Sequence, residues 1–279
     1  MARNIDTQSI LASLVHEQDA EYRKKAKPHL SSHALADFRK CPLLYWQKQQ
    51  GLIQDEDRPA YFLGRAAHVL ILEGRERFDQ GYIVGAPINP RTNKPYGANT
   101  QAYADWAAEQ GKPVLNDEQF ALIANLTTGV RSHQIATELL SNGVAEGVAR
   151  MEYCGKACQA RLDWFNPERG IVDLKTCDDL TWFEADARRY GYAHQMAFYR
   201  AILTQAISGN IARLGTTIPV HIIAVEKKAP FRCGVWALSD QTLAVAQREN
   251  EASIERLKHC ETSNSWPTGY EEVRVFDYV

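Results

Sequence analysis

The sequence predicts an α/β fold in which helices flank a mixed central sheet. The first observation is a set of short, β-leaning runs separated by turn residues, at 149–153, 157–165, 170–176, 220–226 and 234–238. The second is helical spacing of apolar residues before, between and after these runs. The third is composition: 279 residues, 45% hydrophobic and 24% charged, can bury a sizeable core. The order helices, three strands, helix, two strands, helix suits a sheet covered on both faces.

The first part of the chain reads as helical. Residues 4–25 have helical spacing and end in a basic run before Pro28, so we predict that residues 1–28 form an N-terminal helical extension and 29–279 the main domain. A helix capped by Ser31 or Ser32 should run to about Gln50, with a break at Pro42. Further helices are expected from Pro59, over 100–110 and over 117–142, with an exposed loop at 81–99.

The remaining elements follow the same reasoning. Turn signals at 154–156 and 166–170 separate the first three strands. A long helix should span about Trp182–Ser208, and a last helix about Asp240–His259.

Charge, cysteines and hydropathy limit the function. Because the net charge is −2, any binding of nucleic acid must depend on a local concentration of positive charge. The six cysteines are scattered without CxxC spacing, so we expect reduced thiols and no iron–sulfur cluster. No apolar run reaches the ~18–20 residues of a membrane span and no signal peptide is evident, so we expect no membrane association and a cytoplasmic location.

The stretch QARLDWFNPERGIVDLKT carries the clearest chemistry. Asp163 lies on one predicted strand, and Asp173 and Lys175 lie on the next, on the same face because side chains alternate along a strand. A hairpin brings the two carboxylates together, as a Mg²⁺ or Mn²⁺ site for phosphodiester hydrolysis requires. The lysine ammonium can orient water or stabilise the transition state. The alternative is an exposed Asp–Lys ion pair on a surface hairpin.

Three further side chains strengthen the first interpretation. Gln195 and Tyr199 are spaced i,i+4 on the long helix and share a face, although Tyr199 can equally be a packing residue. His68 lies in an otherwise apolar helix, where a neutral imidazole can be either a core residue or a metal ligand.

Together these blocks resemble a known family. G-x-x-x-H (Gly64–His68), R-x-D (Arg161–Asp163), V-D-L-K-T (Val172–Thr176) and G-Y-x-x-Q-x-x-x-Y (Gly191–Tyr199) occur in order. The arrangement resembles the RecE-like, exodeoxyribonuclease VIII-type branch of PD-(D/E)XK exonucleases, which is related to lambda exonuclease and to RecB-like and AddB-like nuclease domains. The resemblance covers the chain from about Leu30 and implies a restriction-endonuclease-like core in residues 29–279.

The resemblance assigns roles to individual residues. It implies that His68, Asp163, Asp173 and the backbone carbonyl of Leu174 bind metal. Lys175 would be the catalytic lysine, supported by Gln195 and Tyr199 in the motif that places the substrate backbone. Glu152 is a candidate acidic group behind the ligands, with an ordinary strand-edge charge as the alternative. Candidate DNA contacts are Ser31 and Ser32, which depart from the family's S-x-S pattern, and Arg39, Arg65, Arg161, Arg188 and Arg189.

The implied activity is a Mg²⁺-dependent 5′→3′ exonuclease, in which Mn²⁺ can substitute, acting on double-stranded DNA ends to leave 3′ single-stranded tails. The resemblance further implies a homo-oligomeric ring, trimer or tetramer, a RecT-like single-strand annealing partner, and a bacterial or phage origin. Two alternatives remain: an endonuclease or repair nuclease of the same superfamily, and a DNA-binding protein without catalysis. Because Asp163, Asp173 and Lys175 are all present, the sequence favours an enzyme.

Overall fold

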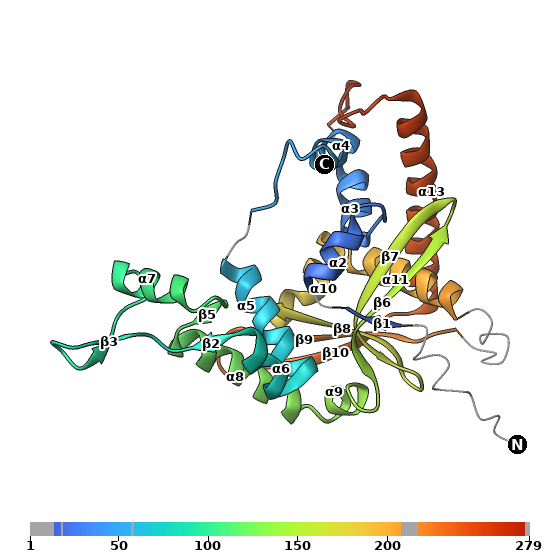
Figure 1. The fold of residues 1–279 in the computed structure, drawn as a ribbon. Helices are drawn as coiled ribbons and strands as arrows, with labels where there is room; N and C mark the ends of the chain where they lie inside the picture. The colour runs from blue at the N-terminus through green and yellow to red at the C-terminus, as the bar shows by residue number, and fades with distance from the viewer. Residues whose placement is uncertain (1–13, 18, 57–58, 208–216, 277–279) are drawn as a thin grey trace, which may run out of the picture.

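A six-stranded sheet with the order β1-β6-β7-β8-β9-β10 forms the centre of the computed structural model, which describes residues 14–17, 19–56, 59–207 and 217–276 (Figure 1). Its strands are β1 (Val15–His16), β6 (Val144–Tyr153), β7 (Lys156–Asn166), β8 (Gly170–Cys177), β9 (Val220–Glu226) and β10 (Cys233–Ala237). Neighbouring strands are antiparallel except β8 and β9, which are parallel. The predicted α/β fold with a mixed sheet is confirmed.

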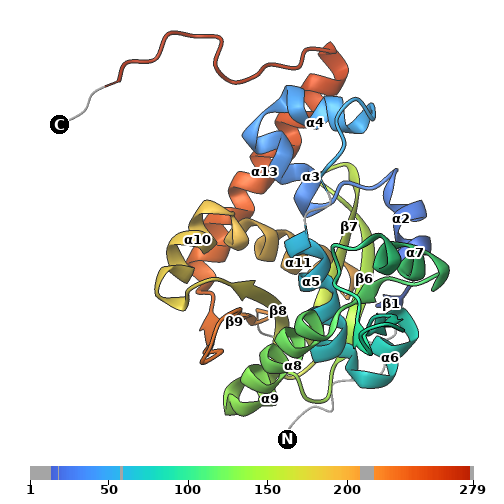
Figure 2. The same cartoon turned by 90° about the vertical axis from the view of Figure 1, so that its left-hand side faces the viewer.

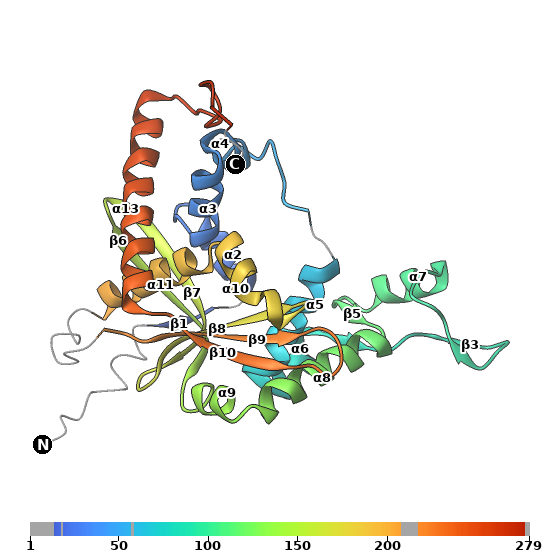
Figure 3. The ribbon, with the colours of Figure 1, turned by 180° about the vertical axis from the view of Figure 1, so that it is seen from behind.

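Helices cover both faces of the sheet (Figures 1 and 3). One layer consists of α3 (Ser32–Lys40), α4 (Pro42–Gln49), α10 (Phe183–Arg189), α11 (Tyr192–Ala206) and α13 (Asp240–Ser263). The other consists of α5 (Pro59–His68), the π-helical turn η1 (Val69–Glu73), α6 (Gly74–Gly81), α8 (Asp117–Ser132) and α9 (Gln134–Leu139). The 3₁₀ turn η2 (Leu180–Trp182), α10 and α11 provide the crossover that the parallel pair β8–β9 requires.

Two hydrophobic clusters hold these layers to the sheet. Ile171 of β8 faces the cluster under α3, α11 and α13, whereas its neighbours Val172 and Leu174 face the cluster over α5 and α8. Each such buried aliphatic side chain contributes about 1.5–3 kcal/mol. The alternation leaves Asp173 on the first face, inside the protein and fully buried. Packing does not explain this buried carboxylate at the centre of the sheet, because neither of its oxygens has a hydrogen-bond partner among the described residues.

The N-terminal segment differs from the predicted extension. Val15 is extended rather than helical, because β1 pairs with β6, and the adjacent Leu14 is buried against Gly147. Backbone pairing with an open sheet edge outweighs the local helical spacing. A helix, α2 (Asp19–Ala26), does follow, while residues 4–13 of the predicted helix lie outside the described residues. The boundary at residue 28 stays a prediction, although the sheet takes its edge strand β1 from the N-terminal side of it.

Several of the other predicted elements have different boundaries. The predicted helix over 117–142 is divided at His133 into α8 and α9. The predicted helix from Trp182 is split at Gly191, whose φ of 70° is left-handed and separates α10 from α11. Strand β6 begins at Val144 rather than 149, since the Gly143–Gly147 stretch masks its strand character in the sequence. The predicted break at Pro42 is confirmed, with Cys41 as the residue between α3 and α4.

The predicted loop at 81–99 is part of an arm that projects from the body beside α5 (Figures 1 and 2). It contains β2 (Ile83–Val84), β3 (Ile88–Asn89), β4 (Lys94–Pro95), α7 (Gln101–Glu109) and β5 (Val114–Leu115). Strands β2 and β5 pair in parallel and close its base, and β3 and β4 form a short hairpin. None of the helices in the described ranges is long and apolar enough to cross a bilayer.

Candidate active site

The two aspartates of the central motif lie where β7 and β8 separate. Ladder pairing between these strands ends at Trp164 and Val172, so the next two residues, Asp163 and Asp173, stand opposite each other at the fork. At the fork the Asp163 side chain links β7 to β8 in place of a backbone hydrogen bond, because its Oδ2 accepts a hydrogen bond of 2.9 Å from the Leu174 amide. The fork frees the two strands to present side chains instead of pairing their backbones.

Asp173 is fully buried beside Lys175. The Lys175 Nζ lies 2.7 Å from Asp173 Oδ2, but within the described structure neither carboxylate oxygen makes a hydrogen bond of ordinary geometry. Burial raises the pKa of Asp173, while the Lys175 charge opposes that rise. Burial by itself lowers the pKa of Lys175, but the charges of Asp173 and Asp163 outweigh it and hold that pKa above its usual value. A buried carboxylate with unused lone pairs is ready to accept a further cation.

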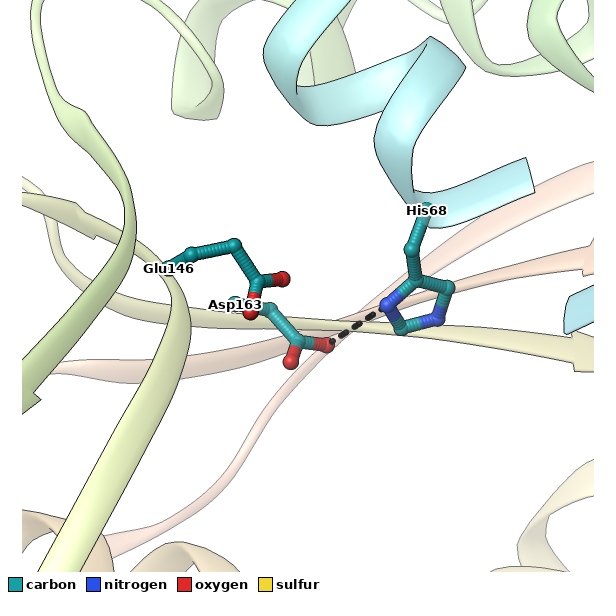
Figure 4. A group of neighbouring side chains, drawn as sticks. All are labelled: His68, Glu146 and Asp163. Carbon is teal, nitrogen blue, oxygen red and sulfur yellow. Dashed lines mark ion pairs between the residues drawn. The ribbon is translucent and has the colours of Figure 1, made fainter. Parts of the chain in front are cut away.

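Beside this pair, His68, Glu146 and Asp163 form a group whose potential ligand atoms all lie within 4.8 Å of one another (Figure 4). His68 Nδ1 is 3.6 Å from Asp163 Oδ2. His68 ends α5 where the chain widens into η1, and such π-turns frequently mark functional positions. Burial lowers the pKa of His68, partly opposed by the Asp163 charge, which keeps the imidazole neutral and able to bind metal.

Glu146 was not predicted from the sequence. Its φ of 53° is left-handed, which is uncommon for a glutamate, and it falls between the ladder pairs Ala145–Trp164 and Gly147–Leu162. It therefore stands opposite Asp163 at a distortion of the β6–β7 ribbon. Backbone outliers of this kind cluster at functional sites. The sequence offered no signal for it, because the predicted strand began after it.

The residue set fits a divalent cation. The donors are one imidazole and carboxylate oxygens, with the unbonded oxygens of Asp173 nearby. Hard oxygen donors with one nitrogen suit Mg²⁺ or Mn²⁺. The group of three closely spaced ligands includes the predicted His68 and Asp163, but its third member is Glu146, while Asp173 is paired to Lys175.

Gln195 and Tyr199 continue the network from α11. Lys175 Nζ donates to Gln195 Oε1 at 3.3 Å, and Gln195 Nε2 donates to the Tyr199 hydroxyl at 3.1 Å. Burial raises the pKa of Tyr199 to about 12, so the hydroxyl stays neutral. The Lys175 ammonium also lies 4.8 Å from the centre of the Tyr192 ring. These contacts fix the position of Lys175, as the motif from Gly191 to Tyr199 led us to expect.

A cavity of about 760 Å³ opens onto these residues. Asp163, Lys175 and Gln195 line it, together with residues of α5 and of the segment that includes β1 and α2. His33 and Tyr22 are among the lining residues that the sequence did not predict. His33 follows the predicted serine pair, and Tyr22 belongs to α2. Neither carries a motif, and only the folding of distant segments brings them to the cavity.

The N-terminal segment is fixed to the cavity wall by charge and stacking. Glu17 is buried and takes paired hydrogen bonds of 2.8 Å from Arg150. Tyr22 lies under the Arg161 guanidinium, 4.5 Å from ring centre to Cζ. Arg161 Nε in turn lies 3.0 Å from Glu146 Oε2. A continuous set of contacts therefore runs from β1 and α2 to the candidate metal ligands.

The predicted DNA contacts divide into two groups. Arg65 and Arg161 line the cavity. The other five do not line the cavity. Ser31 caps α3 by accepting a hydrogen bond from the Ala34 amide, and Ser32 is buried beside the Tyr199 hydroxyl. Arg39 donates a hydrogen bond to Asn250, and Arg188 and Arg189 are exposed on α10.

The placement of Glu152 corrects one prediction. It is exposed near the outer end of the β6–β7 hairpin, where it pairs with Ala157, and it does not line the cavity. The strand carrying it was identified correctly, but the acidic residue at the level of Asp163 is Glu146, six positions earlier.

Comparison with known proteins agrees with this geometry. Residues 31–278 match the model of a family described as a PDDEXK-like domain of unknown function (DUF3799). The chain belongs to this PDDEXK-like family. No curated protein matches it. Among solved structures, a "Putative exonuclease" from Eubacterium rectale is 17% identical with a TM-score of 0.66, over 95% of this chain and 97% of that one.

A second solved structure, an alkaline exonuclease from Laribacter hongkongensis, is 12% identical with a TM-score of 0.32, over 88% of this chain and 100% of that one. At these identities the first likeness supports the fold, and the predicted restriction-endonuclease-like core is confirmed by the family match. The PD-(D/E)XK recognition made from the four sequence blocks is likewise confirmed.

Proposed function

We propose that this protein is a metal-dependent exodeoxyribonuclease that degrades double-stranded DNA from its ends. The observation that carries the proposal is the convergence of Asp163 and Lys175 with His68 and Glu146 in the lining of one cavity, with the buried Asp173 carboxylate 2.7 Å from Lys175 Nζ. Carboxylates, an imidazole and a held lysine are the groups that phosphodiester hydrolysis with a divalent ion uses.

In this proposal the metal ligands and Lys175 have different roles. His68, Glu146, Asp163 and Asp173 would hold Mg²⁺, or Mn²⁺ in its place. The bound ion supplies positive charge for the phosphate and lowers the pKa of attacking water. Lys175, held by Gln195 at 3.3 Å, presents its ammonium to the scissile phosphate and the attacking water. Because the contacts of Lys175 are already made, the group does not have to reorganise during the reaction.

Polarity and product follow from the family resemblance in this proposal. Digestion would proceed 5′→3′ and leave 3′ single-stranded tails for strand annealing during recombination. Arg65 and Arg161 in the cavity wall supply the local positive charge that a chain of net charge −2 needs to bind a polyanion.

The test compares DNA forms and labels. Purified protein with Mg²⁺ is incubated with linear duplex and with covalently closed circular duplex of the same sequence. We expect degradation of the linear form alone, with early release of a 5′ label and late release of a 3′ label. Cleavage of the closed circle would show an endonuclease, and early release of the 3′ label would reverse the polarity.

Assembly is a separate proposal. By the same resemblance we propose a ring of three or four copies through which duplex passes, working with a RecT-like single-strand annealing protein. Light scattering of the purified protein tests the ring directly. A monomer at micromolar concentration, active on long duplex, would contradict it.

A further inference from the structure

We propose that the arm, residues 83–115, is a second contact for DNA: its tip binds the phosphate backbone of the duplex outside the catalytic cavity. This inference rests on the proposed function, because it assigns the arm to the same substrate. It concerns a part of the chain that none of the site residues occupies.

The base of the arm lies at the cavity. Gly81, Tyr82 and Pro113 line the cavity wall, and the paired strands β2 and β5 begin directly after them. Tyr82 stacks on Phe78 with 5.1 Å between ring centres, and Leu115 is fully buried. The arm is therefore anchored in the hydrophobic cluster that includes Phe78 and Leu115 and starts at the cavity wall.

The tip of the arm is a defined turn. The Asn93 amide donates to the Asn89 carbonyl at 2.9 Å, and the Arg91 amide donates to the Asn89 side chain at 2.9 Å. Asn93 has the left-handed φ of 52° that the turn needs and that asparagine tolerates. Figures 1 and 3 show this hairpin at the outer end of the arm, away from the sheet. The turn presents its side chains at a distance from the body.

The charge of the tip favours a polyanion. Between Asp79 and Asp105 the sequence has two cations, Arg91 and Lys94, and no carboxylate. Both are exposed, and neither has a side-chain partner in the part of the chain that the structure describes. The cations Arg75 and Lys156, in contrast, are paired with carboxylates, Asp79 and Glu261 respectively. Two unpaired cations on a projecting turn suit phosphate oxygens.

Because the arm begins at the cavity wall, a duplex whose end is held in the cavity would have its next phosphates within reach of the arm. Phosphate contacts at the tip would add affinity for long duplex without touching the reacting phosphate. Each neutralised phosphate changes the slope of log affinity against log salt by about −0.9. Two contacts give about −1.8, so between 50 and 200 mM salt they account for about a twelvefold loss of affinity.

The experiment compares wild type, Arg91→Ala/Lys94→Ala, and a matched control, Lys40→Ala/Arg248→Ala, which removes two exposed, unpartnered cations from α3 and α13. Fluorescence anisotropy with Ca²⁺ in place of Mg²⁺ gives affinities for blunt duplexes of about 8 to 40 base pairs, at several salt concentrations. Single-turnover cleavage of the shortest duplex in Mg²⁺ tests whether the catalytic centre is intact.

We expect the arm variant to have a salt slope on long duplex that is smaller by about 1.8, with wild-type cleavage of the shortest duplex. Its affinity should be weaker than that of wild type at 50 mM salt, and this difference should shrink about twelvefold by 200 mM. The control variant should match wild type. An unchanged slope would overturn the inference. So would a change of oligomeric state in the arm variant with no change in DNA affinity, since the arm would then bind another copy.

The inference and the proposed function fail in different ways. If wild type binds duplex through the arm but does not cleave it with any divalent ion, the nuclease proposal is wrong and the arm contact stands. If wild type cleaves and the arm variant binds with an unaltered slope, the arm contact alone is wrong. A wild-type chain that binds no duplex overturns both.

Discussion

Replacing Lys175 by methionine tests how much the positive charge of Lys175 stabilises the buried carboxylate of Asp173. Methionine keeps the length and apolar stem of lysine but removes the ammonium 2.7 Å from a fully buried carboxylate. At an effective dielectric constant of about 20, the lost attraction is about 6 kcal/mol. Removing one partner of a buried ion pair costs about 3–5 kcal/mol in practice. We expect the metal-free variant to lose about that stability, which lowers Tm by about 10 °C.

The loss should depend on pH. Burial already raises the pKa of Asp173, and Lys175 is the group that lowers it, so the pKa rises further in the variant. A folded pKa above the unfolded value of about 3.9 means that the penalty is absent at lower pH. The variant should therefore lose stability relative to wild type as pH rises from about 3.9 through the folded pKa, and the loss should be complete above it.

Thermal unfolding with chelator across this pH range measures the effect. Lys175→Met/Asp173→Asn is the control, because it removes both charges of the pair and should regain most of the lost stability. Saturating Mn²⁺ should also stabilise Lys175→Met, by about 2.7 kcal/mol at 100 times its Kd. The reasoning is refuted if Lys175→Met without metal is as stable as wild type at neutral pH and the two pH curves run parallel.

The other predictions concern the groups around this pair. Glu146→Gln should lower Mn²⁺ affinity at least tenfold in calorimetry while the fold persists, and unchanged affinity would remove Glu146 from the ligands. Tyr22→Leu should weaken duplex binding several-fold by releasing Arg161, whereas Tyr22→Phe should restore it because the ring suffices for stacking; equal effects would contradict a positioning role. The Arg150 hydrogen bonds lower the pKa of Glu17 from its usual 4.5 to about 2, so this pair stabilises the fold above pH 4.5 and the contribution is lost as pH falls toward 2. Glu17→Gln should therefore lower stability at neutral pH and flatten the acid limb of a Tm-against-pH curve, and an unaltered limb would contradict it.

The sequence predicted those parts of the site that lie close together along the chain. Asp163, Asp173 and Lys175 fall within thirteen residues, and strand alternation was enough to place Asp173 and Lys175 on one face. The role of Gln195 could be predicted from local spacing as well, because it lies four positions before Tyr199 on the same face of a helix. The fold class followed from element order for a similar reason, since periodicity is a local property.

What the sequence could not predict depends on contacts between distant segments. Glu146 joins the site only because a left-handed residue distorts β6 opposite Asp163, and no local pattern encodes that. Val15 belongs to a stretch with helical spacing of apolar residues but pairs with β6, since an open sheet edge outweighs propensity. Tyr22 lies 139 positions before Arg161 in the chain, and only the docking of α2 stacks them.

The measurement that tests the central claim most directly is the single-turnover cleavage rate of a linear duplex by wild type and by Asp173→Asn. The substitution keeps the shape of a fully buried side chain and removes its charge. In Mg²⁺ we expect cleavage by wild type, none with chelator, and a variant that is folded but less than about a hundredth as active. A folded variant that retains more than that, or a wild type inactive with both Mg²⁺ and Mn²⁺, would contradict the account.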